Sequence, residues 1–170
     1  MDSPKIATLG ELRKTDYKSE SIQQELAGNL RQRLSNGLIT FDGLIGYENT
    51  VIPDIERALL SGHNINLLGL RGQAKTRIAR QMTELLNEWI PIVEGSEIND
   101  CPLSPISQEA KELISKKGEQ TPIKWLHRDN RFFEKLATPD VTVADLIGDV
   151  DPIKAANLRP VSYTHLTLPT

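Results

Sequence analysis

Cysteine, aromatic residues and long apolar runs are all scarce in this sequence. Its single cysteine, Cys101, leaves no second cysteine for a disulfide within the chain, and the histidines His63, His127 and His165 lack zinc-ligand spacing. No apolar run approaches the roughly 20 residues that a membrane-spanning helix needs, and the polar N-terminus lacks the pattern of a signal peptide. The sequence therefore predicts no disulfide framework, zinc site or membrane span, and it favours a cytoplasmic protein.

Charge of one sign is not in large excess either. The formal net charge is −3 in 170 residues, of which 38% are apolar and 25% are charged. This composition is typical of a globular protein, and the length suits one domain with a hydrophobic core. Since a slightly acidic chain has no general attraction to nucleic acid or to anionic membranes, we expect neither as a partner.

Two amphipathic helices are predicted in the first third of the chain, after a polar segment, 1–17, that we expect to be frayed. The first helix begins near Ser19 and stops at Asn36-Gly37. Its apolar stripe recurs every four residues and consists of Ile22, Leu26, Leu30 and Leu34. The second helix is expected from Val51 to Ser61, with Pro53 in its first turn and Gly62 after its end.

A strand, a glycine-rich turn and a helix are predicted next. Residues 64–68 read as a short buried strand and residues 69–74 as a loop. The helix is expected from Lys75 to Trp89, because apolar residues share one face over that whole length. Residues 90–93 form a second predicted strand, and Pro91 favours an edge position. Farther along, short helices are expected at 107–115, at 130–136 and from Thr138-Pro139 to a stop at Gly148.

The segment from Gly69 to Thr76 has the pattern of a phosphate-binding P-loop. Its residues are Gly69, Leu70, Arg71, Gly72, Gln73, Ala74, Lys75 and Thr76. Glycines let the backbone N–H groups wrap around phosphates, while Lys75 is expected to reach the β- and γ-phosphates of ATP and the Thr76 hydroxyl to coordinate Mg²⁺. The general pattern has glycine where this chain has Ala74, and we expect Ala74 to have entered right-handed helical geometry.

This loop resembles the P-loop of AAA+ ATPases of the MoxR and magnesium-chelatase group, which commonly carry alanine before the lysine. Upstream, Leu44-Ile45-Gly46-Tyr47-Glu48 resembles the Ile-Gly box of AAA+ proteins. The resemblance implies that Ile45, Gly46 and Tyr47 lie against the adenine of ATP. Arg71 and Arg77 flank the loop and are candidates to touch phosphate or a neighbouring subunit.

The resemblance extends from Phe41 to Leu158. Residues 93–100 are similar to the segment after the second strand of magnesium-chelatase ATPase subunits, and residues 136–151 resemble a later conserved stretch. The implied fold is α/β: an incomplete P-loop NTPase three-layer sandwich with a parallel sheet, preceded by an N-terminal helical segment. The implied domains are a helical extension, 1–40, a truncated AAA+ nucleotide-binding domain, 41–160, and a non-native tail, 161–170.

The residues that would complete an ATPase are not found. A Walker B strand should end in Asp-Glu, but residues 90–94 contain a proline and residues 141–145 continue with leucine and read as a capped helix. Asp149 and Asp151 lack a third ligand for a metal, so we interpret them as a loop. The tail, 161–170, resembles the translation of a transposon-end adaptor used in sequencing libraries. We therefore expect an N-terminal fragment, with no catalytic residue identifiable and inactive alone.

The predicted function is ATP binding. In the full-length parent, the resemblance implies ATP hydrolysis in a homo-oligomeric ring that remodels a partner protein or a metal-chelatase complex. Two alternatives stay open. One is a P-loop small-molecule kinase or a non-hydrolysing nucleotide-binding module, and the other is an interaction domain that only looks like a P-loop.

Overall fold

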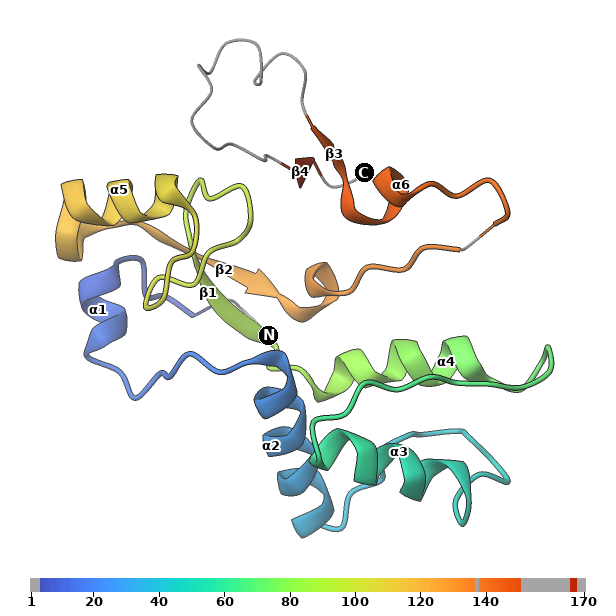
Figure 1. The fold of residues 1–170 in the computed structure, drawn as a ribbon. Helices are drawn as coiled ribbons and strands as arrows, with labels where there is room; N and C mark the ends of the chain where they lie inside the picture. The colour runs from blue at the N-terminus through green and yellow to red at the C-terminus, as the bar shows by residue number, and fades with distance from the viewer. Residues whose placement is uncertain (1–3, 137, 151–165, 168–170) are drawn as a thin grey trace. The chain divides into compact units, whose positions relative to one another are not determined.

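The computed structural model describes residues 4–136, 138–150 and 166–167, and it divides the chain into two compact units (Figure 1). The first unit is Met1–Phe132 and the second is Phe133–Thr170. In these described residues no helix is long and apolar enough to cross a lipid bilayer.

Most of the helices and strands belong to the first unit. In chain order they are α1 (Leu9–Arg13), α2 (Ile22–Ser35), α3 (Val51–Leu60), α4 (Lys75–Gln81), the 3₁₀ helix η1 (Met82–Leu85), β1 (Trp89–Val93), α5 (Gln108–Lys117), the 3₁₀ helix η2 (Gly118–Gln120), β2 (Ile123–His127) and the 3₁₀ helix η3 (Arg128–Arg131). The second unit has α6 (Val143–Ile147), β3 (Asp149–Val150) and β4 (Leu166–Thr167), and β3 pairs antiparallel with β4.

The helices α2 and α3 confirm the signals read from the sequence. Ser21 caps α2 through a capping box, in which its hydroxyl accepts from the Gln24 N–H at 3.3 Å while the Gln24 side chain accepts from the Ser21 N–H at 3.0 Å. The α2 helix ends at Asn36, and α3 is followed by Gly62 at φ 68°. A capping box therefore fixes the start of α2, whereas Thr50, the N-cap residue of α3, makes no side-chain capping hydrogen bond.

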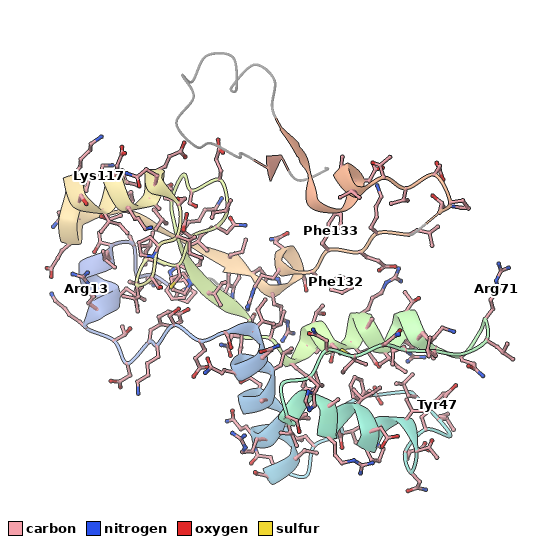
Figure 2. All side chains as sticks on the ribbon, in the orientation of Figure 1. Arg13, Tyr47, Arg71, Lys117, Phe132 and Phe133 are labelled. Carbon is pink, nitrogen blue, oxygen red and sulfur yellow. The ribbon has the colours of Figure 1, made fainter. Side chains whose placement is uncertain are left out.

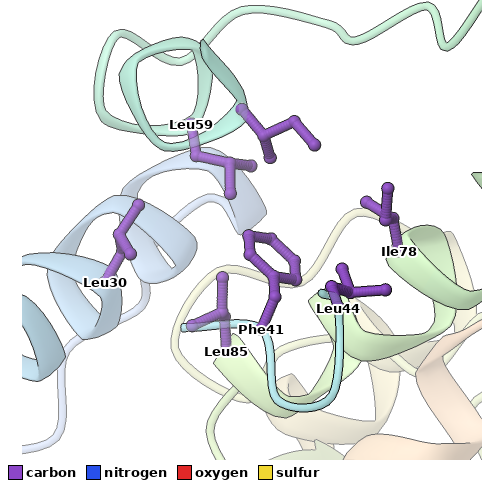
Figure 3. Packing of buried hydrophobic residues seen from close by; sticks show 7 residues of the cluster. Leu30, Phe41, Leu44, Leu59, Ile78 and Leu85 are labelled. Carbon is purple, nitrogen blue, oxygen red and sulfur yellow. The ribbon is translucent and has the colours of Figure 1, made fainter. Parts of the chain in front are cut away.

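One hydrophobic core joins α2, α3, α4 and the segment that follows α2 (Figure 3). Its buried members are Leu30, Phe41, Leu44, Ile55, Leu59, Ile78 and Leu85. Leu30 and Leu85 are fully buried, whereas Ile22, on the same predicted stripe of α2, is 59% exposed. The core therefore uses the middle of the α2 stripe and packs α4 against α2 and α3.

Residues 4–17 contain a packed helix, so the prediction of a frayed N-terminal segment is wrong for these residues. Leu9 and Leu12 of α1 are fully buried, and the Leu9 N–H donates to the Thr121 carbonyl at 2.9 Å. The Ile123 N–H in turn donates to the Ala7 carbonyl at 2.9 Å, and the Trp125 indole N–H donates to the Ile6 carbonyl at 2.8 Å. Two leucines placed three residues apart are enough to anchor this short helix beside β2.

The strand β1 confirms the strand predicted at 90–93. It pairs antiparallel with β2, and Pro91 lies opposite Trp125. A proline cannot donate a backbone hydrogen bond, so a two-stranded sheet that leaves one side of β1 unpaired accommodates it. The described residues contain no parallel strand pair. The parallel sheet of the expected three-layer sandwich therefore stays a prediction.

Residues 64–68 do not form the strand that their composition predicts. The segment 63–70 has no regular secondary structure; Ile65 and Leu67 pack against the core and Leu68 is 86% exposed. The side chains alternate as they do in a strand, but no neighbouring strand among the described residues pairs with the backbone. Strand formation requires such a partner, and composition alone does not supply one.

The predicted helix 75–89 is also too long. The α-helix ends at Gln81, a 3₁₀ turn continues to Leu85, and Trp89 begins β1. The Thr83 hydroxyl donates to the Arg80 carbonyl at 2.7 Å, and Asn29 of α2 donates to the Leu85 carbonyl at 2.7 Å. The Arg80 and Leu85 carbonyls thus accept hydrogen bonds from side chains, whereas in a longer helix they would accept from backbone N–H groups.

Four predictions near the C-terminal end have mixed outcomes. The helix expected at 107–115 is confirmed by α5, with Ser107 as its N-cap, whereas the helix expected at 130–136 is wrong, since only η3 forms there. The last helix starts at Val143, after the Thr142 cap rather than at Pro139, and ends at Gly148 as predicted. The interpretation of 141–145 as a capped helix is confirmed, because the Asp145 carboxylate accepts from the Thr142 N–H at 2.9 Å.

A buried ion pair connects α2 to η3. The Arg131 guanidinium donates two hydrogen bonds to the Glu25 carboxylate, at 2.7 and 2.5 Å, and the two side chains are only 9% and 5% exposed. The same carboxylate accepts from the Asn87 N–H at 2.7 Å. Removing one partner would leave the other charge buried without compensation.

We therefore expect Arg131→Met to lower the free energy of unfolding by about 3 kcal/mol in urea titrations. The double variant Glu25→Met/Arg131→Met should recover most of that loss, because no unpaired charge remains. Arg33→Met is the matched control, since the Arg33–Glu84 pair is only partly buried and its charged atoms are 4.0 Å apart, and it should cost less than about 1 kcal/mol. Equal losses for Arg131→Met and Arg33→Met would contradict this role.

A second buried carboxylate, that of Asp100, organises the loop after β1. It accepts hydrogen bonds from the Ile106 N–H at 2.6 Å, the Ser107 N–H at 3.0 Å and the Ser96 hydroxyl at 2.7 Å, and the residue is 3% exposed. Burial alone would raise the pKa of Asp100, but the hydrogen bonds from Ser107, Ile106 and Ser96 outweigh it and hold the pKa below its ordinary value.

A carboxyl group whose pKa is lowered by folding contributes stability above its unfolded pKa, and that contribution is lost as the pH falls through the folded pKa. We expect Asp100→Asn to lower the free energy of unfolding by about 2 kcal/mol at neutral pH. Below about pH 4 the difference from the parent chain should shrink. Asp16→Asn, at an exposed aspartate, should leave the free energy of unfolding unchanged at both neutral and acidic pH. If Asp100→Asn lowered the free energy of unfolding by the same amount at every pH, the stabilising role of the ionised Asp100 would be contradicted.

Candidate phosphate-binding loop

The candidate loop, residues 69–74, projects from the core between the extended segment 63–70 and the start of α4. Arg71 lies at its tip and points away from the rest of the first unit (Figure 2). Residues 69–73 are exposed, whereas Ala74 packs against the core and Ile78, one turn into α4, is 2% exposed. The loop is therefore open to a ligand at its tip and anchored at its base.

Ala74 does not have the conformation expected from the sequence. Its backbone is left-handed, at φ 54° and ψ 13°, so the expectation of right-handed helical geometry is wrong. A β-carbon in this region costs roughly 1–2 kcal/mol, and glycine avoids that cost. The P-loop pattern has glycine at this position, and the turn into α4 explains why.

Lys75 and Gln73 close the loop from inside. The Lys75 ammonium donates to the Gly69 carbonyl at 2.9 Å and also to the Leu70 carbonyl. The Gln73 side-chain oxygen accepts from the Leu70 N–H at 2.9 Å. The Lys75 ammonium and the Leu70 N–H are thus held at the same turn, and the acceptor of the Leu70 N–H is the side-chain oxygen of Gln73.

Gly69 leaves room for the Gln73 side chain to cross the loop in the position that it takes here. A β-carbon on Gly69 would lie 2.1 Å from the Gln73 side-chain oxygen and 3.9 Å from the Lys75 ammonium nitrogen. Gly72 is required for a different reason, its positive φ of 83°. The two glycines therefore permit a close approach and a tight turn, which are the roles that a phosphate-binding loop assigns to glycine.

The segment before α3 is held against α4. The Gln81 side-chain amide donates to the Asp42 carbonyl at 2.8 Å, and the Arg77 guanidinium donates to the same oxygen at 3.3 Å. A β-carbon on Gly43 would lie 2.5 Å from the Arg77 guanidinium. Arg77, a candidate for phosphate contact, is therefore bound to the Asp42 backbone in this structure.

The three residues of the Ile-Gly segment have different positions. Tyr47 packs against the same core cluster as Ala74. Gly46 is at φ 87°, and its N–H donates to the Glu48 carboxylate at 3.0 Å. Ile45 is 89% exposed and lines a groove that includes no residue of the loop. Tyr47 thus shares a core cluster with the base of the loop, whereas Ile45 is exposed.

The predicted metal ligand, Thr76, is exposed in the first turn of α4. Mg²⁺ takes oxygen ligands and is commonly held by one or two protein groups together with substrate phosphates, so a single hydroxyl beside a phosphate fits that ion. Within the described residues no group of three or more His, Cys, Asp or Glu could hold a metal ion. Asp149 begins β3, so its interpretation as a loop residue is wrong, and Asp151 lies outside the described residues.

Sequence reasoning missed the residues that fix the loop from its flanks. The sequence predicts Gln73 as a nucleotide-binding residue but not its bond to Leu70, and it indicates no role for Asp42 or Gln81, which are joined by a hydrogen bond. A glutamine can donate or accept in many directions, so no spacing rule identifies its partner. Only Gly43, two residues before the Ile-Gly pair, carries a local signal of a close approach.

A comparison with known protein families, with curated proteins and with solved structures finds no match to this chain.

The left-handed backbone at Ala74 gives a direct test of the loop geometry. We expect Ala74→Gly to leave the free energy of unfolding unchanged or to raise it by up to about 1 kcal/mol, since relief of strain exceeds the entropy that glycine adds to the unfolded chain. Ala79→Gly, inside α4, is the matched control and should lower it by about 1 kcal/mol. Urea titrations would measure both. A loss at Ala74 as large as that at Ala79 would contradict the left-handed turn.

Proposed function

We propose that the loop 69–76 binds the phosphates of Mg·ATP. The observation that carries this proposal is the placement of the Lys75 ammonium and the Leu70 N–H at one glycine turn, where the Gln73 oxygen is already held. An anionic phosphate oxygen is a stronger acceptor than an amide oxygen, because charge-assisted hydrogen bonds are about twice as strong as neutral ones. Phosphate would therefore displace Gln73 and engage the cation beside it.

The charge of the loop supports an anionic ligand. Residues 69–76 include Arg71 and Lys75 and no acidic residue. Arg71 is at the exposed tip, where it can reach an anion without leaving a buried partner behind. Thr76 follows directly and would offer its hydroxyl to Mg²⁺, which in turn would neutralise part of the phosphate charge.

We assign nucleotide binding, and not hydrolysis, to the residues described here. Hydrolysis in P-loop enzymes needs an acidic residue beside the metal and commonly an arginine that stabilises the transferred phosphoryl group. The best acidic candidate, Asp145, caps α6 instead. In the full-length protein we propose that ATP hydrolysis drives remodelling of a partner protein or a metal-chelatase complex by a homo-oligomeric ring in the cytoplasm.

The second candidate is a P-loop small-molecule kinase or a non-hydrolysing nucleotide-binding module. The shared cluster, which includes Leu44 and Ile78 and against which Tyr47 and Ala74 pack, supports the first candidate. A kinase has no need of that segment, so loss of ATP affinity on Tyr47→Ala would further separate the two.

Binding of Mg·ATP to the full chain, measured by isothermal titration calorimetry, tests the site directly. We expect Lys75→Met to weaken binding at least about tenfold, since it removes the charge that faces the phosphates. Lys124→Met, at an exposed lysine of β2, is the matched control and should bind as the parent chain does.

Replacement of Gln73 should change the affinity for Mg·ATP in the opposite direction to Lys75→Met. Gln73→Ala removes the oxygen that competes with phosphate, and we expect it to strengthen Mg·ATP binding about threefold. Equal affinity for the parent chain and Lys75→Met would show that the nucleotide site is elsewhere. Weaker binding by Gln73→Ala would show that this side chain contacts the ligand and does not compete with it.

A further inference from the structure

A groove separate from the loop opens between the end of α2, the segment that follows it and α3. It encloses about 570 Å³. Its lining residues are Leu34, Leu38, Ile39, Thr40, Phe41, Asp42, Gly43, Leu44, Ile45, Glu48, Ile52 and Glu56. Phe41 and Leu44 belong to the core, so the floor of the groove is held in place by packing. None of residues 69–76 lines it.

The walls of the groove expose large apolar side chains. Ile45 is 89% exposed, Ile39 is 72% exposed and Leu38 is 56% exposed. Single exposed apolar residues are ordinary, but a contiguous apolar hollow with polar residues around it is typical of an interaction site. Volumes of several hundred Å³ take a few side chains of a bound segment.

The charged residues of the groove all have the same sign. They are Asp42, Glu48 and Glu56, and among the described residues no Lys, Arg or His lines the groove. Glu56 uses one oxygen to accept from the Thr40 hydroxyl at 2.6 Å, and Glu48 uses one to accept from the Gly46 N–H at 3.0 Å, so each has a second oxygen for a ligand. The nearby Arg77 guanidinium binds the Asp42 backbone carbonyl and not the Asp42 carboxylate.

We propose that this groove binds a basic amphipathic helix of a partner protein. Apolar residues at helical spacing would fill the hollow between Ile39 and Ile45, and lysine or arginine beside them would pair with the carboxylates. A symmetric contact between two copies of this chain is disfavoured, since it would bring the same three carboxylates of each copy face to face. The loop 69–76 and the groove share no residue, although Ile45 of the Ile-Gly segment lines the groove.

A synthetic amphipathic peptide of leucine and lysine at helical spacing is the probe, and its leucine–glutamate counterpart is the charge control. Fluorescence anisotropy with the full chain would measure both. We expect the lysine peptide to bind and the glutamate peptide to bind at least about tenfold more weakly. Raising the salt concentration should weaken binding of the lysine peptide, because its ion pairs with the groove carboxylates are at the protein surface.

Two double variants test the groove itself. Ile39→Ser/Ile45→Ser removes the apolar walls of the groove. Glu48→Gln/Glu56→Gln removes two negative charges and keeps the shape of the side chains. We expect each double variant to weaken binding of the lysine peptide about tenfold. The matched controls are Ile106→Ser, at an apolar residue that is 77% exposed, and Glu94→Gln/Glu109→Gln, at two exposed carboxylates; both should change the affinity less than about twofold. Circular dichroism would establish that every variant is folded.

Three results would overturn the proposal. One is equal binding of the two peptides, and another is a loss of affinity in the control variants as large as in the groove variants. The third is a dimer of the parent chain in sedimentation that the groove variants convert to a monomer, since the occupant would then be a second copy.

Discussion

The packing of Ile78 against Phe41 and Leu44 is the contact on which the candidate site depends. It fixes the first turns of α4 against the segment that follows α2, and Arg77 and Gln81 reinforce it through the Asp42 carbonyl. Lys75 lies one turn before Ile78, so the same packing sets the position from which the ammonium reaches back to Gly69 and Leu70. A loop that is exposed over most of its length is thus positioned by apolar contacts at its base.

Two surfaces of opposite chemistry are attached to this core. The loop presents Arg71 and Lys75 without an acidic residue, and the groove presents three carboxylates without a cation. They share no residue, yet Leu44 lines the groove and packs beside Ile78 of α4. The residues that would contact a ligand on either surface are therefore attached to the same hydrophobic core, which includes Leu44 and Ile78.

Local signals were sufficient where a structure is determined by neighbouring residues. The caps at Ser21 and Ser107, and the stops at Gly62 and Gly148, predict the helix limits because each satisfies backbone groups within its own turn. The P-loop pattern likewise identified a glycine turn and the lysine that closes it. Long-range partners were not predictable: residues 64–68 have the composition of a strand but no pairing strand, and α1 is ordered by contacts with residues more than a hundred positions away.

The conformation of Ala74 shows the limit of pattern matching at the site itself. An alanine in place of glycine suggested helical geometry, but the path from the extended segment into α4 needs a left-handed residue there, whatever its side chain. Gln73 shows the same limit for contacts, since its partner follows only from the folded turn.

The measurement that tests the central claim most directly is a titration of the ¹⁵N-labelled full chain with Mg·ATP, followed through its amide NMR signals. Binding at the loop predicts that the largest shifts occur at the backbone amides of 69–76 and at the side-chain amide of Gln73, which would lose its contact with Leu70. Shifts confined to other parts of the chain, with the loop signals unchanged at saturation, would contradict phosphate binding by this turn.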